Sequence, residues 1–386
     1  MGNIMDYIRW RGDLPLSKSP FNEVDNLIFS ELCYMDFKDI VPSDFKSPGI
    51  SLKEAVKLVE KRSDEHNDLG LLIPGDVLDM LKIMKTSLRY SNMRLYGYVN
   101  EIDTAKARQF SALTIDTCDK CVYVAYRGTD DTLAGWREDL EFACSPFVPA
   151  QKRACEYLAL VSKQFPFKRL RVGGHSKGGN LAIYAAVHSG PVTKRKLTDI
   201  WSNDGPGFLD DIHKKDEYIA IADKIHSIIP KSSFVGMLLE HDDNHTVVDS
   251  SELGLMQHNG FTWQVLGNSF VTLPKIQDAA LSSSLAIRKW FSEVSPDKRR
   301  EFSDALYEIL TSSGAKTFTD LKEANFKDYL SIIKATMNID KEIRNGLIEF
   351  IQLLITLNAR LVLDGMQHED KILKLKNPFD KQPKQN

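Results

Sequence analysis

The sequence predicts an α/β fold: a mostly parallel central sheet flanked by helices, followed by a helical C-terminal subdomain. From about residue 91 to residue 277, short segments rich in Val, Ile and Tyr alternate with segments whose apolar residues recur at helical spacing. Strands joined by crossover helices give this alternation. Beyond residue 277 the strand-like segments stop, although helical spacing continues. We therefore expect one domain over 1–277 and a helical subdomain over 278–370.

The N-terminal part of the domain, residues 1–90, is predicted to be mostly helical, because its apolar residues recur at helical spacing after polar starts. The predicted helices are 22–32, 52–61 and 77–88. From residue 93 the pattern becomes extended, with β-branched and aromatic residues separated by turn residues. The predicted strands of this part are 93–102, 109–116 and 121–127.

Helices and strands then alternate along the chain, as expected of a sheet with crossover helices. The predicted elements are a helix over 150–165, a strand over 169–174, a helix over 181–187, and strands over 197–202 and 224–229.

The predicted C-terminal subdomain begins with a helix at Ser295 and Pro296, since serine caps helices and proline favours their first turn. Its apolar face consists of Phe302, Ala305, Leu306, Ile309 and Leu310. The apolar segment 346–363 contains polar residues at intervals, so we expect a buried helix and not a membrane span. The lysine-rich end, 371–386, is predicted to be a solvated, flexible tail.

The segment Gly174-His175-Ser176-Lys177-Gly178 is the strongest indication of function. A G-x-S-x-G pattern between a strand and a helix is typical of a nucleophile elbow, a strained turn that exposes a serine Oγ. Glycine is needed two positions before and after the serine, because a Cβ there would collide with the neighbouring strand and helix. The N-terminus of the following helix favours negative charge. Ser176 is therefore the predicted nucleophile.

A serine nucleophile requires a histidine that accepts its proton and, usually, a carboxylate that orients the histidine. Folds with this elbow place the serine first, the acid second and the histidine last, which excludes His66. His258 lies in a loop after the last predicted strand and is the favoured base, with His245 and His241 as alternatives. Of the other histidines, His213 is interpreted as a surface residue and His226 as a core imidazole within a strand. His188 falls at the far end of the helix from the strand ends, and the side chain of His175 is expected to point in a different direction from that of Ser176.

The acid is harder to assign, because residues 230–234, which follow the strand 224–229, contain no carboxylate. Asp204 follows the preceding strand in a turn that would hold its side chain at the strand's carboxyl end, and we select it as the acid. A turn aspartate also commonly bonds its own backbone, which is the competing interpretation. The alternative acids are Asp242, Asp243 and Asp249.

An oxyanion hole combines the N–H after the nucleophile with an N–H from a loop after an earlier strand. The first of these is the N–H of Lys177. The strand 121–127 ends at Gly128 and Thr129, where glycine permits close approach of the backbone to a substrate and threonine adds a hydroxyl. Thr129 and Lys177 are the predicted oxyanion donors.

Several motifs of this chain resemble those of class 3 lipases, a group of α/β-hydrolases. The R-G-T, W-x-x-D-L and G-H-S-x-G-G signatures of that group occur here in the same order, within 125–129, 135–140 and 173–179. A bacterial branch of lipase-like proteins is also similar at 11–13, 20–25, 204–208 and 257–258. Together these similarities extend over roughly residues 5–270.

The resemblance implies a lipase-like α/β-hydrolase fold, with Ser176 as nucleophile and His258 as base. It also implies Thr129 and Lys177 as oxyanion donors. The chain departs from the group in two places. Class 3 lipases usually carry their acid in an N-D-x-V-P-type segment after the strand that precedes the histidine, where residues 231–235 stand here. A small or apolar residue usually occupies the position of Lys177.

These observations predict an esterase- or lipase-like serine hydrolase that cleaves carboxylic esters through an acyl-serine intermediate. The expected substrate is an ester or an acyl lipid, and neither a metal nor an organic cofactor is required. The alternative is a binding or regulatory protein on the same fold, with weak or no catalytic activity. The absence of a carboxylate in residues 230–234 favours this alternative. Any lid would come from residues 234–256 or from the C-terminal helices.

The composition is that of a globular protein, with 42% hydrophobic and 27% charged residues. A net charge of −3 argues against a dedicated nucleic-acid binder. The five cysteines suit a reducing compartment, and Cys118 and Cys121 lack the second pair of a zinc site. Because no targeting or transmembrane pattern is present, we expect a cytoplasmic protein whose membrane contact is at most transient. The oligomeric state stays open.

Overall fold

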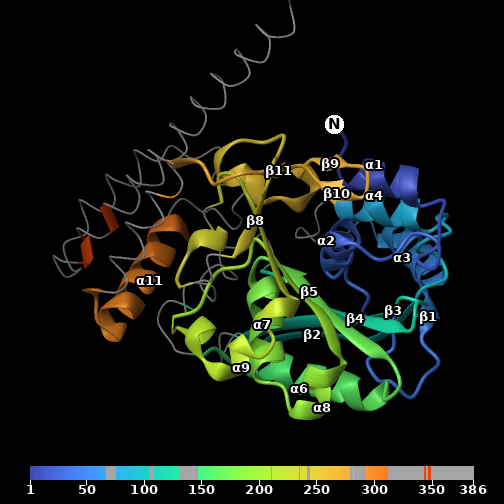
Figure 1. Cartoon of the computed structure of the whole chain (residues 1–386), viewed down its shortest axis with the longest axis horizontal. Coiled ribbons are helices and arrows are strands. Elements are labelled where there is room, and N and C mark those ends of the chain that lie inside the picture. The colour runs from blue at the N-terminus through green and yellow to red at the C-terminus, as the bar shows by residue number, and fades with distance from the viewer. Residues whose placement is uncertain are drawn as a thin grey trace, which may run out of the picture.

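A computed structural model describes residues 1–66, 75–103, 108–129, 142, 147–209, 211–233, 235–240, 244–278, 281, 293–311, 343–344 and 347–348. Within this part of the chain, a nine-stranded sheet is covered by helices, and a short two-stranded sheet lies beside it (Figure 1). The α/β class predicted from the sequence is confirmed.

The large sheet has the strand order β1-β2-β3-β4-β5-β6-β7-β8-β11. Strands β4 to β8 run parallel, whereas β1 to β3 at one edge and β11 at the other pair antiparallel with their neighbours. The strands are β1 Ile50–Ser51, β2 Arg94–Asp103, β3 Arg108–Asp116, β4 Cys121–Tyr126, β5 Arg169–His175, β6 Leu197–Asn203, β7 Ile225–Pro230, β8 His245–Val248 and β11 Thr272–Leu273. The six predicted strands agree with the structure to within one residue at each end.

The strands after β7 differ from the prediction. The sequence analysis predicts no strand at β8. His258 does not follow the last strand either, because the hairpin of β9 (Val265–Leu266) and β10 (Ser269–Phe270) and then β11 come after it. Strands of two residues are too short to show alternation in a sequence, and β11 is fixed by its pairing with β8.

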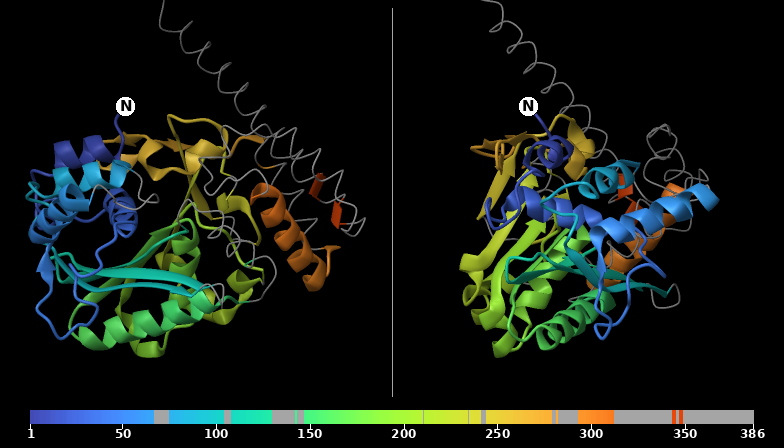
Figure 2. Two further views of the ribbon diagram at one scale, coloured as in Figure 1. Left: turned by 180° about the vertical axis from the view of Figure 1, so that it is seen from behind. Right: turned by 90° about the vertical axis from the view of Figure 1, so that its right-hand side faces the viewer.

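Helices cover both faces of the sheet (Figures 1 and 2). Alternate residues of β4 point to opposite faces, so Val122 and Val124 join the hydrophobic core beneath α6 and α7, whereas Tyr123 and Ala125 join the core beneath α2. The helices are α1 Ile4–Arg11, α2 Glu23–Leu32, α3 Leu52–His66, α4 Gly75–Met84, α6 Pro149–Gln164, α7 Lys177–Val187, α8 Pro191–Lys196, α9 Asp216–Ile219 and α11 Pro296–Thr311. Short 3₁₀ turns are η2 Ile212–Lys214, η3 Ala222–Lys224, η4 Val235–Met237, η5 Gly254–His258 and η6 Gly260–Thr262.

Helix α2 is anchored at both its start and its flank. The Asn22 side chain accepts from the N–H groups of Val24 and Asp25, while Asp25 accepts in return from the N–H of Asn22, forming a capping box. Asp25 is fully buried against the Arg89 guanidinium and accepts a 2.6 Å hydrogen bond from the Tyr90 hydroxyl. A buried ion pair with these further hydrogen bonds fixes the orientation of α2 over the sheet.

A buried polar network joins α2 to the end of β5. The Asn26 amide donates to Oδ1 of Asn203 at 2.8 Å, and the Asn203 amide donates to the carbonyl oxygen of Gly174 at 3.0 Å. Tyr123 adds a 2.7 Å hydrogen bond to Oδ1 of Asn26. Because every member is bonded, the network ties the turn after β5 to the helix above it.

The C-terminal helix that the sequence predicts at Ser295 is confirmed as α11, and the N–H of Lys298 lies 3.5 Å from the Ser295 hydroxyl. Its buried residues Phe302 and Leu306 belong to the core beneath α6 and α7. Most of the predicted subdomain over 278–370, including the helix over 346–363, and the tail over 371–386 lie outside the described residues, so this division of domains stays a prediction. No helix within the described ranges has the length and apolar character needed to cross a membrane.

Candidate active site

The turn between β5 and α7 has the geometry expected of a nucleophile elbow. Ser176 adopts φ 56° and ψ −131°, a conformation rare for a residue with a side chain. A Cβ on Gly174 would lie 2.4 Å from the carbonyl carbon of Gly178, and a Cβ on Gly178 would lie 2.1 Å from the carbonyl oxygen of Tyr126. The interpretation of the two glycines as sites of close backbone approach is confirmed.

The structure brings Asp204 and His258 into direct contact. Asp204 follows β6 in a left-handed conformation, with φ 49°, and its main-chain N–H donates to Ile228 of β7 at 2.7 Å. Its Oδ2 accepts a 2.6 Å hydrogen bond from Nδ1 of His258. The Asp204 side chain is 1% exposed and that of His258 is 24% exposed, so the carboxylate is shielded while the imidazole reaches solvent.

The bonds to Asp204 determine the tautomer of His258. The other carboxylate oxygen, Oδ1, accepts from the Ser233 hydroxyl and from the N–H of Gly236 at 3.1 Å. A carboxylate with these donors accepts only, so Nδ1 of His258 carries the proton and Nε2 keeps its lone pair. Ser233 lies in the segment after β7, where the sequence contains no carboxylate. This segment instead donates a hydrogen bond to Asp204, which follows β6.

His258 also lies next to the elbow. Its ring packs on the ring of His175, the residue before Ser176, with the ring centroids 4.6 Å apart and the planes inclined by 35°. Nε2 of His175 donates to the carbonyl oxygen of His258 at 2.7 Å. Ser176, Asp204 and His258, which the sequence selected separately, are therefore gathered where the parallel strands end.

The two expected oxyanion donors flank the same serine. A Cβ on Gly128 would lie 2.5 Å from the carbonyl oxygen of His175 and 3.0 Å from Cβ of Ser176, so the loop after β4 lies tightly against the elbow. Thr129 is the next residue of this loop and is 9% exposed. Lys177 is the first residue of α7, so its main-chain N–H lies at the N-terminus of that helix. Its side chain is 1% exposed, which is rare for lysine.

The alternative bases and acids lie elsewhere or outside the described residues. His245 is the first residue of β8, and Asp249 accepts a 2.6 Å hydrogen bond from the Lys231 ammonium. The three residues His241, Asp242 and Asp243 lie outside the described ranges, as does the W-x-x-D-L motif within 135–140.

The remaining histidines have different surroundings. His226 stacks on Trp201, with centroids 4.1 Å apart, and lies 3.4 Å from Asp199. Its side chain is 38% exposed, so the prediction of a core imidazole was wrong. His188 is exposed at the end of α7. The side chain of His213 is only 20% exposed, so the prediction of a surface residue was wrong; η2 turns this ring inward.

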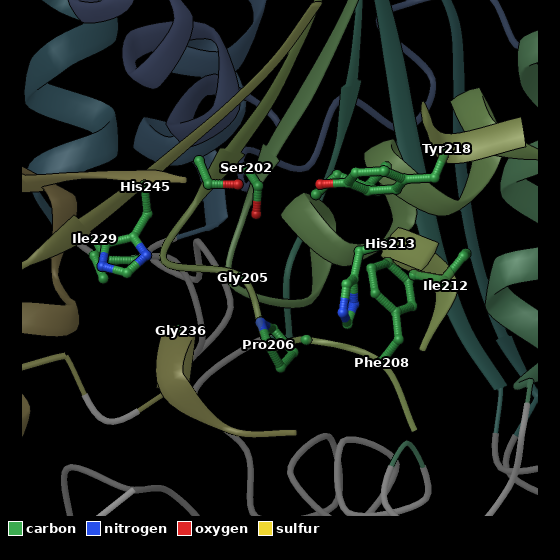
Figure 3. Close-up of a pocket in the computed structure, with 13 residues that line it drawn as sticks. Ser202, Gly205, Pro206, Phe208, Ile212, His213, Tyr218, Ile229, Gly236 and His245 are labelled. Atoms are coloured by element: carbon green, nitrogen blue, oxygen red, sulfur yellow. The ribbon is translucent and has the colours of Figure 1, made fainter. Parts of the chain in front are cut away.

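The described part of the molecule contains a pocket behind the Asp204 turn, on the α7 side of the sheet, and Figure 3 shows His213 and His245 at opposite sides of it. Ser176 and His258 do not line it. Its lining consists of Ile183, Ser202, Gly205, Pro206, Gly207, Phe208, Ile212, His213, Tyr218, Ser227, Ile229, Gly236 and His245. Gly236 links the pocket to the site, because its N–H bonds Asp204.

A second carboxyl and a second imidazole lie beneath the base, and the sequence analysis missed this arrangement. Nδ1 of His175 lies 3.1 Å from the Tyr34 hydroxyl and 3.7 Å from Oε1 of Glu31. Burial, and secondarily the charge of His258, lower the pKa of His175 to about 3. Burial, with a smaller contribution from Asp76, raises the pKa of Glu31 to about 8. The sequence contains an indication of the buried carboxyl group, because Glu31 lies within the apolar run of the predicted helix 22–32.

Within the described residues, no group of three or more His, Cys, Asp or Glu side chains is arranged to hold a metal ion. Cys118 and Cys121 lie at the hairpin between β3 and β4, where the sequence places them, one exposed and one buried.

The strand order, the elbow after β5, and the acid and histidine in later loops of the sheet define an α/β-hydrolase of the lipase-like type. The chain belongs to the Mbeg1-like family, whose model matches residues 84–308.

The structure is similar to three fungal lipases at low identity. The Rhizomucor miehei lipase propeptide complex is 14% identical, with a TM-score of 0.35, over 59% of this chain and 68% of that chain. Lip2 lipase from Yarrowia lipolytica is 14% identical, with a TM-score of 0.30, over 43% of this chain and 69% of that chain. Lipase II from Rhizopus niveus is 15% identical, with a TM-score of 0.34, over 58% and 78%. A comparison with curated proteins gives no match.

Proposed function

We propose that this protein is a serine hydrolase that cleaves carboxylic esters, with Ser176 as nucleophile, His258 as base and Asp204 as acid. The observation that carries the proposal is the 2.6 Å hydrogen bond between Asp204 and His258, beside a serine on a strained elbow. Such a turn serves no packing purpose, whereas a hydrolase requires it.

The geometry supports acyl transfer in two steps. Oγ of Ser176 forms a bond to the ester carbonyl carbon while Nε2 of His258 takes its proton, and Asp204 stabilises the resulting imidazolium. The N–H groups of Thr129 and Lys177 would stabilise the oxyanion of the tetrahedral intermediate. When this intermediate collapses, His258 returns the proton to the leaving alcohol. Water then cleaves the acyl-Ser176 ester by the same route and releases the acid.

The competing role, a hydrolase-fold protein with little or no turnover, was favoured by the lack of a carboxylate after β7. Asp204 supplies a carboxylate to His258 from the end of β6, and Ser233 and Gly236 hold it there. The contact between Asp204 and His258 therefore weakens the argument for a binding or regulatory role that the sequence alone supports.

The substrate that we propose is an ester or an acyl lipid, on the strength of the motifs shared with class 3 lipases. No cofactor takes part, because the serine, imidazole and carboxylate supply the nucleophile and the proton transfers. The thiols of Cys33, Cys118, Cys121 and Cys155 are free, and this supports a reducing compartment such as the cytoplasm. Contact with a membrane surface would be transient.

Labelling with a fluorophosphonate probe tests the proposal, since the probe phosphonylates activated serines. We expect wild-type protein to label, Ser176→Ala to lose all labelling, and His258→Ala to label far more slowly. Ser189→Ala is the matched control, because Ser189 follows the other end of α7 and bonds only the carbonyl oxygen of Ala186 there. A folded wild-type protein that does not label contradicts the proposal, as does label that persists in Ser176→Ala.

A further inference from the structure

We propose that His175 is a positioning residue for His258, that Tyr34 holds it in the required tautomer, and that Glu31 controls whether this tautomer persists. This inference rests on the proposed hydrolase function and deepens it. It assigns roles to three side chains that do not belong to the Ser–His–Asp set: Glu31 in α2, Tyr34 just beyond that helix, and His175 at the end of β5.

The hydrogen bonds around His175 have a fixed direction. The carbonyl oxygen of His258 can only accept, so Nε2 of His175, at 2.7 Å, must carry a proton. In the neutral ring Nδ1 then has only a lone pair, and the Tyr34 hydroxyl at 3.1 Å must be the donor to it. The chain of donors runs from Tyr34 through His175 to the backbone of His258, whereas the bond with Asp204 is made by the His258 ring.

The ring of His175 also forms a wall for the base. Its centroid lies 4.6 Å from that of His258, and its side chain is 7% exposed, so the contact excludes water from one face of the base. The depressed pKa of His175 keeps this ring neutral at neutral pH. A neutral neighbour matters because His258 must become positively charged during the reaction, and a second imidazolium at this distance would oppose that step.

Glu31 determines whether His175 stays in this state. Its carboxyl group is 5% exposed, Oε1 has no hydrogen-bond partner among the described residues, and a Cβ on Gly260 would lie only 2.6 Å from Oε1. The titratable groups that face the pair are Tyr34 beyond α2, Asp76 on α4 and His258 on η5. When Glu31 is protonated, the Tyr34 hydroxyl remains the donor to Nδ1 of His175. An ionised Glu31 would favour the other tautomer of His175, in which the single ring proton moves from Nε2 to Nδ1. Nδ1 could then no longer accept from Tyr34, and Nε2 could no longer donate to the carbonyl oxygen of His258.

The test compares rates of fluorophosphonate labelling of Ser176 across a range of pH for wild type and four variants. His175→Phe keeps a ring beside His258 but removes both hydrogen bonds, whereas His175→Gln retains an amide N–H near the position of Nε2. Tyr34→Phe removes only the donor to Nδ1. Glu31→Gln keeps a neutral side chain at every pH and serves as the matched variant for the ionisation of Glu31.

We expect His175→Phe to lower the labelling rate at least about tenfold, the usual scale for losing a buried hydrogen bond that holds a reacting group. His175→Gln should recover most of this loss, and Tyr34→Phe should show an intermediate loss. The wild-type rate should fall above about pH 8, where Glu31 ionises, and Glu31→Gln should lack that fall. A merely structural role of His175 predicts loss of folded protein, without rescue by glutamine and without a change in the pH profile.

The outcomes separate this inference from the proposed function. If wild type labels at Ser176 while His175→Phe and Tyr34→Phe label at the wild-type rate, the positioning role is wrong and the hydrolase function stands. If wild type does not label, the hydrolase function fails, and the positioning role fails with it. Where His175→Phe does not fold, Tyr34→Phe and Glu31→Gln decide the question, because each keeps the size of the side chain that it replaces.

Discussion

Two carboxyl–imidazole contacts lie near the elbow, and they differ in distance and in the hydrogen bonds that the carboxyl group accepts. Asp204 meets His258 at 2.6 Å and accepts two further hydrogen bonds, whereas Glu31 stands 3.7 Å from His175 with an oxygen that has no partner in the described structure. The first contact gives the carboxyl group three hydrogen-bond partners, one of them His258. The second holds a neutral acid against a base that burial keeps neutral.

The difference shows that donors, and not proximity alone, decide the state of a buried carboxyl group. Ser233 and the Gly236 N–H donate to Asp204, which is 1% exposed, in place of the water that burial excludes. Glu31 is equally buried but lacks this replacement, and its pKa rises to about 8. The three predictions that follow perturb one side of this comparison at a time.

The largest effect is expected for Asp204→Asn. The variant keeps the size of the side chain but favours the wrong tautomer of His258 and removes the charge that stabilises its imidazolium. Ester hydrolysis and phosphonylation should fall by about 10⁴-fold, the scale seen when the acid of such a triad is made neutral. Steady-state kinetics with p-nitrophenyl esters and the rate of probe labelling both measure this loss.

Asp199→Asn is the control for that variant. Asp199 lies on β6, the strand that ends just before Asp204, and it pairs with His226 at 3.4 Å, but both side chains are about one-third exposed. An exposed pair contributes at most about 1 kcal/mol to stability, and this one has no part in the proposed site. Equal losses of activity in the two variants would contradict the role of Asp204.

The next effect concerns stability and pH, through Glu31→Gln. Burial raises the pKa of Glu31 from 4.5 to about 8, so between these values the folded protein holds a proton that the unfolded chain has lost. The free energy of unfolding that Glu31 contributes therefore falls as pH rises, by about 1.4 kcal/mol per pH unit. Glu31→Gln lacks this fall and should gain stability over wild type by a few kcal/mol between about pH 5 and about pH 8.

Urea denaturation of both proteins across this range measures the difference directly. His175 contributes with the opposite sign, because its lowered pKa costs stability as pH falls from 6.5 toward about 3. Because both proteins contain His175, it does not contribute to the difference between their free energies of unfolding above pH 6.5. Parallel stability curves for wild type and Glu31→Gln would show that Glu31 is already ionised at neutral pH.

The smallest effect is expected for Ser233→Ala, which removes one of the donors to Asp204 and leaves the Gly236 N–H in place. Loss of a hydrogen bond to a charged group amounts to about 1.5–3 kcal/mol, so turnover should fall by roughly 10- to 100-fold. Ser232→Ala is the matched control, since the neighbouring hydroxyl bonds Gln277. An unchanged rate for Ser233→Ala would mean that Asp204 needs no donor besides the backbone.

Much of the site could be predicted because its central parts are local in sequence. The elbow is a pattern of five residues, and its glycines, strand and helix are all adjacent to Ser176. Asp204 could be selected because a turn aspartate after β6 stands at the correct edge of the sheet. His258 followed from chain order, although three short strands that the sequence does not reveal come after it.

The supporting residues could not be predicted, since they act through contacts that span the chain. Tyr34 and His175 are 141 positions apart, and Ser233 lies 29 positions from Asp204. The apolar run of α2 predicted a helix correctly, but it gave no indication that Glu31 would lie beneath the His258 loop. Side chains of this kind are specified by tertiary packing, which single-sequence periodicity does not report.

The most direct test of the central claim is the pre-steady-state reaction of the wild-type protein with an activated p-nitrophenyl ester, combined with mass spectrometry of the quenched protein. The account predicts a burst of p-nitrophenol approaching one equivalent per folded chain, and an acyl group on the peptide that contains Ser176. Ser176→Ala should show neither. A folded wild-type protein that gives no burst and no acyl adduct at Ser176 would contradict the account.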